Sequence, residues 1–192
     1  MGASIISLNI SKIINKIKFD KKQKILIYCW RGGLRSLSLY LVLKQIGYDV
    51  TLLDGGYKNY RRFVVKFFEI SCEKYKFNQI MGVTGVGKTL FIKELSKNYQ
   101  VIDFEGLANH KGSILGNIPN KNQPSQKYFE TLIYEKLNSF NSKKNIWVEA
   151  ESIKVGKLSI PSKIWKNMPL GKNVKVISSL EERVRFILKD YK

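Results

Sequence analysis

Apolar residues in the first part of the chain form a helical stripe, followed by a strand, a helix and a second strand. The run KILIYC at 24–29 shows no alternation of polar and apolar residues, as expected of a buried parallel strand. An apolar stripe over 34–46, ended by Gly47, predicts a helix, and DVTLLDGG at 49–56 predicts another strand. Together they predict a βαβ unit. Isoleucines at helical spacing predict an amphipathic helix before it, at Ile10, Ile13, Ile14 and Ile17.

The same order of strand, helix and strand is predicted again in the second part of the chain. A helix is predicted over 60–70, after which apolar periodicity is lost and charge accumulates, so we place a domain boundary near 72–78. The first domain is then 1–76 and the second is 77–192. Strand, helix and strand follow again at 79–83, 88–99 and 100–106. This order predicts an α/β fold with parallel strands in both parts.

A loop rich in Gly, Asn and Pro occupies 107–126 and is too long for a plain connector, which indicates a functional segment. A helix over 128–140 and a strand over 145–151 are predicted after this loop. A tail bounded by prolines ends the chain, and no internal repeat is visible.

Charge and composition narrow the class of partner and compartment. The 192 residues carry a net charge of +19, yet 44% of them are apolar, which is too many for a disordered polycation. The charge therefore lies on folded surfaces, either as a plain solvated surface or as a binding surface for nucleic acid. Cys29 and Cys72 are too far apart for a zinc knuckle, and no disulfide framework exists, which predicts a reducing, cytoplasmic setting. The longest apolar stretch is too short to cross a membrane.

The sharpest local pattern is a phosphate-binding loop of the form GxxxxGK[ST]. A predicted strand precedes it and a predicted helix follows it, which is the context that this motif requires. Its glycines let backbone N–H groups turn inward on a diphosphate, while the lysine adds a charge and the threonine hydroxyl can hold Mg²⁺. The residues are Gly82, Gly85, Gly87, Lys88 and Thr89.

An acid at the end of a neighbouring strand usually works with such a loop by ordering Mg²⁺. Asp103 and Glu149 are the two candidates, and we favour Asp103 because Asp is the more usual residue. His110, the only histidine, lies in the long loop, where it either contacts substrate or braces a turn. With one histidine and no neighbouring cysteine, we expect no transition-metal site.

The second constellation is an eight-residue loop, CWRGGLRS, between a predicted strand and a predicted helix. A cysteine there faces free N–H groups, the positive end of a helix dipole and two guanidiniums, all of which favour thiolate over thiol. Cys29 is therefore the candidate nucleophile, and Cys72, without such surroundings, is expected to be structural. The rest of this anion cradle is Arg31, Gly32, Gly33, Arg35 and Ser36.

The cysteine loop resembles the active site of rhodanese domains, and its pairing with a phosphate loop resembles the tRNA 2-selenouridine synthase family. Further motifs similar to those of the family follow in the family's order, namely LDGGYKNYRR, DFEGLANHKGS, QPSQKYFE, VEAES and EERV. The resemblance implies a partial rhodanese-like βαβ unit followed by a P-loop NTPase-like domain. Members of this family extend beyond both ends of the sequence. The P-loop domain is thus expected to be C-terminally incomplete, and a complementing N-terminal fragment is an expected partner.

The resemblance implies modification of the wobble uridine in tRNA, in which selenium from selenophosphate replaces the sulfur of 2-thiouridine. It further implies an S-geranyl intermediate made from geranyl diphosphate, with Cys29 as the catalytic cysteine and the phosphate loop as the diphosphate site. The expected partners are tRNA and an enzyme that supplies selenophosphate. Arg61 and Arg62, beside aromatic residues, are candidates for RNA contact.

Departures from the family pattern bear on these expectations. Lys111 stands where the family carries arginine, which keeps the charge but loses bidentate geometry. Ala150 and Ile153 replace an acid and an arginine. Two other interpretations stay open: a P-loop kinase or ATP-dependent sulfurtransferase with a rhodanese appendage, and an inactive remnant that binds RNA.

Overall fold

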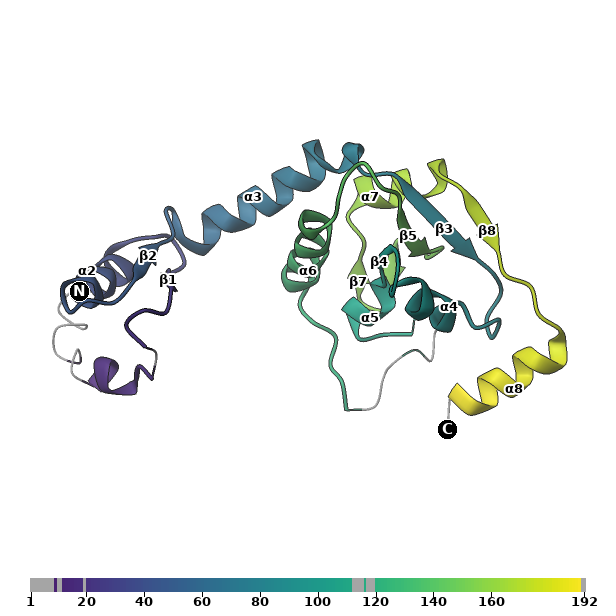
Figure 1. Cartoon of the computed structure of the whole chain (residues 1–192), viewed down its shortest axis with the longest axis horizontal. Coiled ribbons are helices and arrows are strands. Elements are labelled where there is room, and N and C mark those ends of the chain that lie inside the picture. The colour runs from purple at the N-terminus through teal and green to yellow at the C-terminus, as the bar shows by residue number, and fades with distance from the viewer. Residues whose placement is uncertain (1–8, 10–11, 19, 112–115, 117–119, 191–192) are drawn as a thin grey trace. The chain divides into compact units, whose positions relative to one another are not determined.

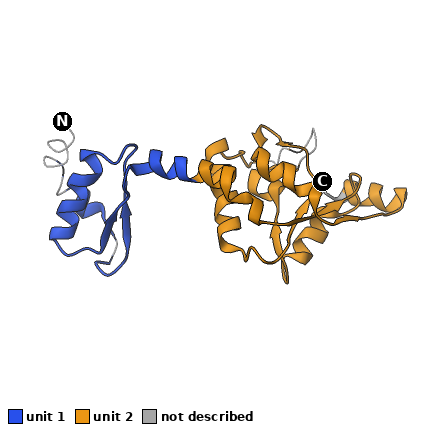
Figure 2. Ribbon diagram, turned by 90° about the horizontal axis from the view of Figure 1, so that it is seen from above, with its two compact units in different colours: residues 1–63 blue, residues 64–192 orange. Residues whose placement is uncertain are grey.

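The computed structural model describes residues 9, 12–18, 20–111, 116 and 120–190. The chain divides into two compact units, residues 1–63 and 64–192 (Figure 2). The division falls inside helix α3, Gly56–Ile70, and so lies earlier than the boundary predicted near 72–78. The reason is that the second half of α3 packs within the second unit, where its Val64, Phe67 and Phe68 are buried.

The first unit is a βαβ arrangement, as the apolar pattern predicts (Figure 1). Strand β1, Ile25–Ile27, pairs in parallel with β2, Val50–Leu52, and helix α2, Leu34–Gln45, connects them. Gly47 follows the helix with a φ of 88°, a left-handed conformation that glycine adopts without strain. Residues 12–16 are helical, in agreement with the stripe of isoleucines, although Ile10 lies outside the described residues.

The cysteine loop of the first unit is held against the start of α3. The N–H groups of Tyr57 and Lys58 donate to the carbonyl oxygens of Cys29 and Trp30, at 3.0 and 2.9 Å. Gly56 is packed so closely on this loop that a Cβ there would collide with the carbonyl oxygen of Cys29. The loop and the first turn of α3 therefore form one tightly joined piece of backbone.

The second unit contains a four-stranded parallel sheet in the order β4-β5-β3-β8. The strands are β3 at Phe77–Met81, β4 at Gln100–Ile102, β5 at Ile146–Glu149 and β8 at Asn173–Lys175. The helices are α4 at Lys88–Leu95, α5 at Phe104–Ala108, α6 at Gln126–Ser139, α7 at Ser162–Asn167 and α8 at Leu180–Asp190. A hairpin of β6, Lys154–Val155, and β7, Leu158–Ser159, and two 3-10 helices, Cys72–Lys74 and Met168–Leu170, complete it.

Three segments differ from the sequence predictions. The expected tail contains the β6–β7 hairpin, α7, β8 and α8, and β8 joins the sheet beside β3 although all its residues are exposed. The apolar signal of this strand is short, since only Val174 and Val176 alternate with polar residues, and pairing with β3 positions it. Helix α4 ends at Leu95, short of the predicted 88–99. The predicted loop over 107–126 begins within α5, and its segments 112–115 and 117–119 lie outside the described residues.

The two units differ in how much apolar surface they bury. In the second unit, β3 is buried along most of its length, and α6 contributes Phe129, Ile133 and Leu137 to the core. In the first unit, buried Ile27 and Leu43 are accompanied by exposed leucines on β1 and α2: Leu26, Leu34, Leu37 and Leu41. Among the described residues, no helix is both long and apolar enough to span a membrane.

Candidate functional site

The phosphate loop lies where strand β3 ends and helix α4 begins. Gly85 and Gly87 have φ values of 85° and 84°, so both positions of the turn use backbone conformations that other residues rarely adopt. The ammonium group of Lys88 donates to the carbonyl oxygen of Gly82 at 2.9 Å and pairs with Glu149 at 3.3 Å. Lys88 is thus held across the mouth of the loop, at the amino end of α4, where anions bind.

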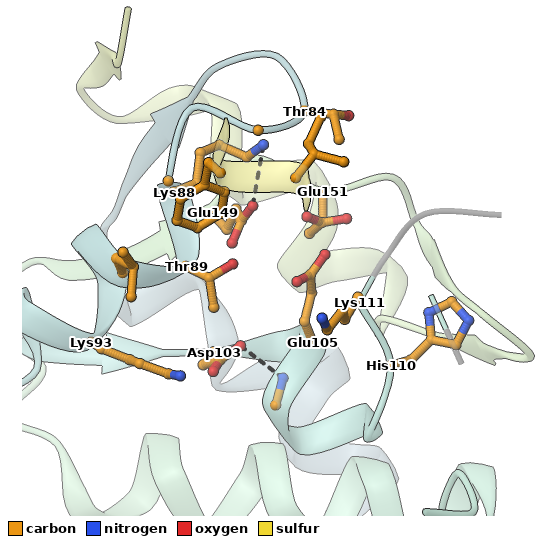
Figure 3. Close-up of a pocket in the computed structure, with 16 residues that line it drawn as sticks. Thr84, Lys88, Thr89, Lys93, Asp103, Glu105, His110, Lys111, Glu149 and Glu151 are labelled. Carbon is orange, nitrogen blue, oxygen red and sulfur yellow. Dashed lines mark hydrogen bonds and ion pairs between the residues drawn. The ribbon is translucent and has the colours of Figure 1, made fainter. Parts of the chain in front are cut away.

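A pocket of about 390 Å³ opens at this loop. Figure 3 shows Glu149 beside Lys88 and Asp103 on the same side as Thr89, with Glu105 and Glu151 across from Thr89. The pocket is lined by Gly85, Gly87, Lys88 and Thr89 of the loop together with Asp103, Glu149 and His110, whereas Gly82 is not among its lining residues. Residues given no role from the sequence also line the pocket: Thr84, Leu90, Lys93, Glu105, Gly106, Glu151, Phe186 and Ile187. Lys111, which the family resemblance singles out, lines it too.

Three of the pocket's carboxylates form a compact cluster. One oxygen atom from each of Glu105, Glu149 and Glu151 lies within 4.8 Å of the other two. Burial, with the nearby carboxylates as the next cause, raises the pKa of Glu105 to about 8 and that of Glu151 to about 7. Burial also raises the pKa of Glu149, while Lys88 opposes that rise. A cluster of this kind carries its full negative charge only when a cation shares the site, and otherwise binds protons that neutralise part of this charge.

The strand order explains why Glu149 is nearer the phosphate loop than Asp103. Strand β5 pairs directly with β3, so Glu149 at its carboxyl end meets Lys88, whereas β4 lies one strand further out. The Asp103 carboxylate accepts a hydrogen bond from the N–H of Gly106 at 2.7 Å and so caps helix α5. Although both acids line the pocket, the geometry favours Glu149 as the partner of the loop, against the preference for Asp103.

His110 is buried at the edge of the pocket. Its ring points away from the acidic cluster in Figure 3. A Cβ at Gly156, in the turn of the β6–β7 hairpin, would lie 2.7 Å from the ring. His110 therefore packs against this hairpin turn while also lining the pocket.

The cysteine loop of the first unit surrounds Cys29 with hydrogen-bond donors. The N–H of Gly33 and the hydroxyl of Ser36 both lie 3.2 Å from the Cys29 sulfur. Gly33 is the residue that precedes helix α2, so the sulfur lies at the positive end of this helix. Cys29 itself is partly accessible, which a reactive thiol requires.

These donors lower the pKa of the Cys29 thiol from 9.0 to about 6. The Ser36 hydroxyl is the largest cause, and the N–H groups of Arg31, Gly33 and Ser36 reinforce it against a smaller opposing effect of burial. Arg31 thus acts through its backbone N–H. Free N–H groups are among the causes expected from the sequence, whereas the guanidiniums of Arg31 and Arg35, expected to contribute as well, are not among the causes. The second thiol behaves oppositely, since burial raises the pKa of Cys72.

Alkylation of the two cysteines with iodoacetamide, followed against pH, is expected to separate them. Cys29 should label with an apparent pKa near 6, while Cys72 stays largely unreactive at neutral pH. Ser36→Ala should raise the apparent pKa of Cys29, because the hydroxyl no longer stabilises the thiolate. Ser38→Ala is the matched control, since the Ser38 hydroxyl donates to Leu34. Equal labelling of both cysteines at pH 6.5 would contradict an activated thiol.

The predicted RNA contacts lie on helix α3. Arg62 is exposed and Arg61 is half-buried, and both belong to the first unit, which also carries Cys29. The aromatic ring of Tyr57, one turn earlier, contacts that of Trp30 at 5.4 Å between centroids. The two arginines therefore lie on the helix whose first turn is joined to the cysteine loop.

The fold and the two sites define a protein that joins a rhodanese-like cysteine loop to a P-loop domain. Comparison with known protein families supports this class of protein. Residues 75–192 match the tRNA 2-selenouridine synthase AAA domain, and residues 3–62 match the rhodanese-like domain. The chain belongs to the tRNA 2-selenouridine synthase family.

Several curated relatives carry the name tRNA 2-selenouridine synthase. The protein from Shewanella piezotolerans is 33% identical over 90% of this chain and 47% of its own length. The protein from Nitrosomonas europaea is 36% identical over 86% of this chain and 44% of its own length. That from Psychromonas ingrahamii is 32% identical over 100% of this chain and 52% of its own. The chain thus spans about half the length of these relatives, and no solved structure matches it.

Proposed function

We propose that this chain takes part in the conversion of 2-thiouridine to 2-selenouridine in tRNA, with a prenyl diphosphate and selenophosphate as co-substrates. The observation that carries the proposal is that one chain holds both an activated cysteine in a rhodanese-type loop and a phosphate loop with a formed pocket. The names of the relatives support the tRNA substrate.

The phosphate loop suits the first step of this exchange. The sulfur of 2-thiouridine forms a bond to the first carbon of the prenyl chain while the bond from that carbon to the diphosphate oxygen breaks. The diphosphate leaves with the electron pair, and its growing charge needs stabilisation as it departs. The loop N–H groups and Lys88 lie where they supply it. In the second step the Cys29 thiolate is the candidate nucleophile: its sulfur bonds to C2 of the prenylated base while the prenyl thiol leaves. The selenium of selenophosphate then displaces the Cys29 sulfur from C2, and water cleaves the Se–P bond to release phosphate.

The acidic cluster fits Mg²⁺ in the same pocket. A diphosphate and several carboxylates repel one another, and a divalent cation coordinated by oxygen atoms of both removes this repulsion. Thr89, Glu149 and the neighbouring Glu105 and Glu151 offer the hard oxygen ligands that Mg²⁺ prefers. When bound, the cation would neutralise part of the charge on the leaving group.

An apolar groove beside the phosphate pocket favours a prenyl diphosphate over a nucleotide. The two share Gly87, Leu90, Lys93 and Phe186, so a ligand anchored at the loop can reach the groove. A hydrocarbon chain buried there gains about 0.8 kcal/mol for each CH₂ group removed from water. The remaining lining of the groove is Val86, Phe91, Glu94 and Val176.

Calorimetry in the presence of Mg²⁺ tests this assignment through a series of ligands. Geranyl diphosphate should bind at least tenfold more tightly than inorganic diphosphate, with the shorter dimethylallyl diphosphate between them, because each added apolar carbon enters the groove. ATP and GTP should bind more weakly than the geranyl compound. If ATP binds most tightly and is turned over, the site is that of a kinase or an ATP-dependent sulfurtransferase, and the proposal is wrong.

A further inference from the structure

Aromatic side chains gather around the cysteine loop in the first unit. The ring of Tyr57 stacks with that of Tyr28 at 6.5 Å and contacts those of Trp30 and Tyr60 at 5.4 and 6.2 Å. Tyr28 is 56% exposed and Trp30 is 49% exposed. Two large aromatic side chains on either side of a reactive cysteine thus remain open to solvent while a third supports them from α3.

The backbone holds this aromatic cluster in place. Tyr28 and Trp30 belong to the segment that follows β1, and hydrogen bonds from the first turn of α3 join Tyr57 and Lys58 to the carbonyl groups of Cys29 and Trp30. Gly56 approaches the same loop so closely that no side chain would fit between the two segments. The aromatic rings are therefore positioned before any ligand binds, which lowers the entropic cost of binding.

Positive charge surrounds the same surface. Arg31, Lys58 and Arg62 are exposed residues of the loop and of α3. Basic side chains that follow a phosphate backbone, together with aromatic rings on which bases stack, are the combination by which proteins bind single-stranded nucleic acid. An apolar protein partner would not need these cations.

The uncovered aliphatic surface of this unit is a different feature. It consists of leucines on β1 and α2, such as Leu26, Leu34 and Leu41. The aromatic cluster instead involves the segment after β1 and the first turns of α3. A partner strand that covered the leucines would leave the chemistry of the aromatic cluster unexplained.

We propose that Tyr28, Trp30 and Tyr57 form a stacking platform for an unpaired base of the RNA, next to the base that reacts at Cys29. This inference rests on the proposed function and adds the surface that recognises the substrate. Since every base has an aromatic face, the platform holds the single-stranded loop in position without reading its sequence, while the basic residues follow the phosphates.

The test is the binding of a fluorescein-labelled tRNA anticodon stem-loop to the full chain, measured by anisotropy. Trp30→Ala should weaken binding roughly tenfold, which corresponds to about 1.4 kcal/mol and lies in the range of one base stacked on an aromatic ring. Trp30→Phe should restore most of the affinity. Tyr99→Ala and Tyr128→Ala are matched controls, because these tyrosines of the second unit are about as exposed as Tyr28 and Trp30. Each control variant should change the affinity for the stem-loop less than twofold.

Two further measurements separate stacking from charge and from misfolding. A stem-loop with one abasic site beside the wobble position should bind the wild-type chain roughly tenfold more weakly than the intact stem-loop does. The Trp30→Ala variant should bind this abasic stem-loop as tightly as the wild-type chain does. The salt dependence should be unchanged in Trp30→Ala but shallower by about 0.7 in logarithmic slope in Arg62→Ala. If the wild-type chain binds RNA and no abasic site weakens it, the platform is wrong while the proposed function stands. If the chain binds no RNA, both are wrong.

Discussion

Lys88→Ala is expected to weaken the binding of geranyl diphosphate roughly 100-fold, because one charge-assisted contact contributes about 1.5–3 kcal/mol. The loss should lie at the upper end of this range. Lys88 also pairs with Glu149, so its removal leaves the acidic cluster without the nearby cation that offsets it. The measurement is calorimetric titration of the wild-type chain and the variant under the same Mg²⁺ concentration.

Lys97→Ala is the matched control for this experiment. Lys97 belongs to the segment just after α4, but it pairs with Glu94 on an exposed surface at 2.7 Å. Its removal should leave diphosphate affinity within about twofold of the wild type, since exposed ion pairs contribute little. Unchanged binding in Lys88→Ala would mean that the phosphate loop does not hold the ligand.

Cys29→Ala is expected to lower the rate of selenium transfer by on the order of 1,000-fold or more, as is usual when the nucleophile of an enzyme is removed. Diphosphate binding should be unchanged, because the phosphate loop lies in the other unit. The measurement is single-turnover appearance of 2-selenouridine in tRNA. This pairing of a lost rate with retained binding would separate a chemical role from loss of folding.

Cys72→Ser is the control for the cysteine variant. The Cys72 thiol is buried and donates to the carbonyl oxygen of Phe68 at 2.8 Å, a contact that a serine hydroxyl can also make. Transfer should therefore continue at close to the wild-type rate. Equal loss in both variants would show that thiol removal acts through stability rather than through chemistry.

The elements with strong local signals could be predicted from the sequence. The unbroken apolar run before Cys29 and the stripe ended by Gly47 correspond to β1 and α2, and the glycines of the phosphate loop adopt the turn that their pattern requires. Strand β8 was not predicted, because only Val174 and Val176 alternate there with polar residues and its place beside β3 depends on strand order. The division inside α3 depends on which part of the helix finds a buried surface, which periodicity alone does not reveal.

The candidate site, like the fold, was predicted from the sequence only where local patterns determine it. Local motifs identify Lys88 and Cys29, but the acidic cluster depends on strand order, which brings Glu149 beside the loop and Glu105 near it. The strand predicted over 145–151 offered a signal for Glu151, since residues two apart on a strand point to the same side, but β5 ends at Glu149 and Glu151 lies just beyond it. The role of Ser36 required the loop's conformation, because its hydroxyl reaches a sulfur seven residues earlier.

The most direct test of the proposed function is selenium transfer to tRNA by the wild-type chain. The chain would be incubated with tRNA that contains 2-thiouridine, together with geranyl diphosphate, Mg²⁺ and selenophosphate. The nucleosides of the digested tRNA would then be identified by liquid chromatography and mass spectrometry. We expect 2-selenouridine to form with the wild-type chain and not to form with either the Cys29→Ala or the Lys88→Ala variant. Unaltered 2-thiouridine with the wild-type chain, or product formed equally well by Cys29→Ala, would contradict it.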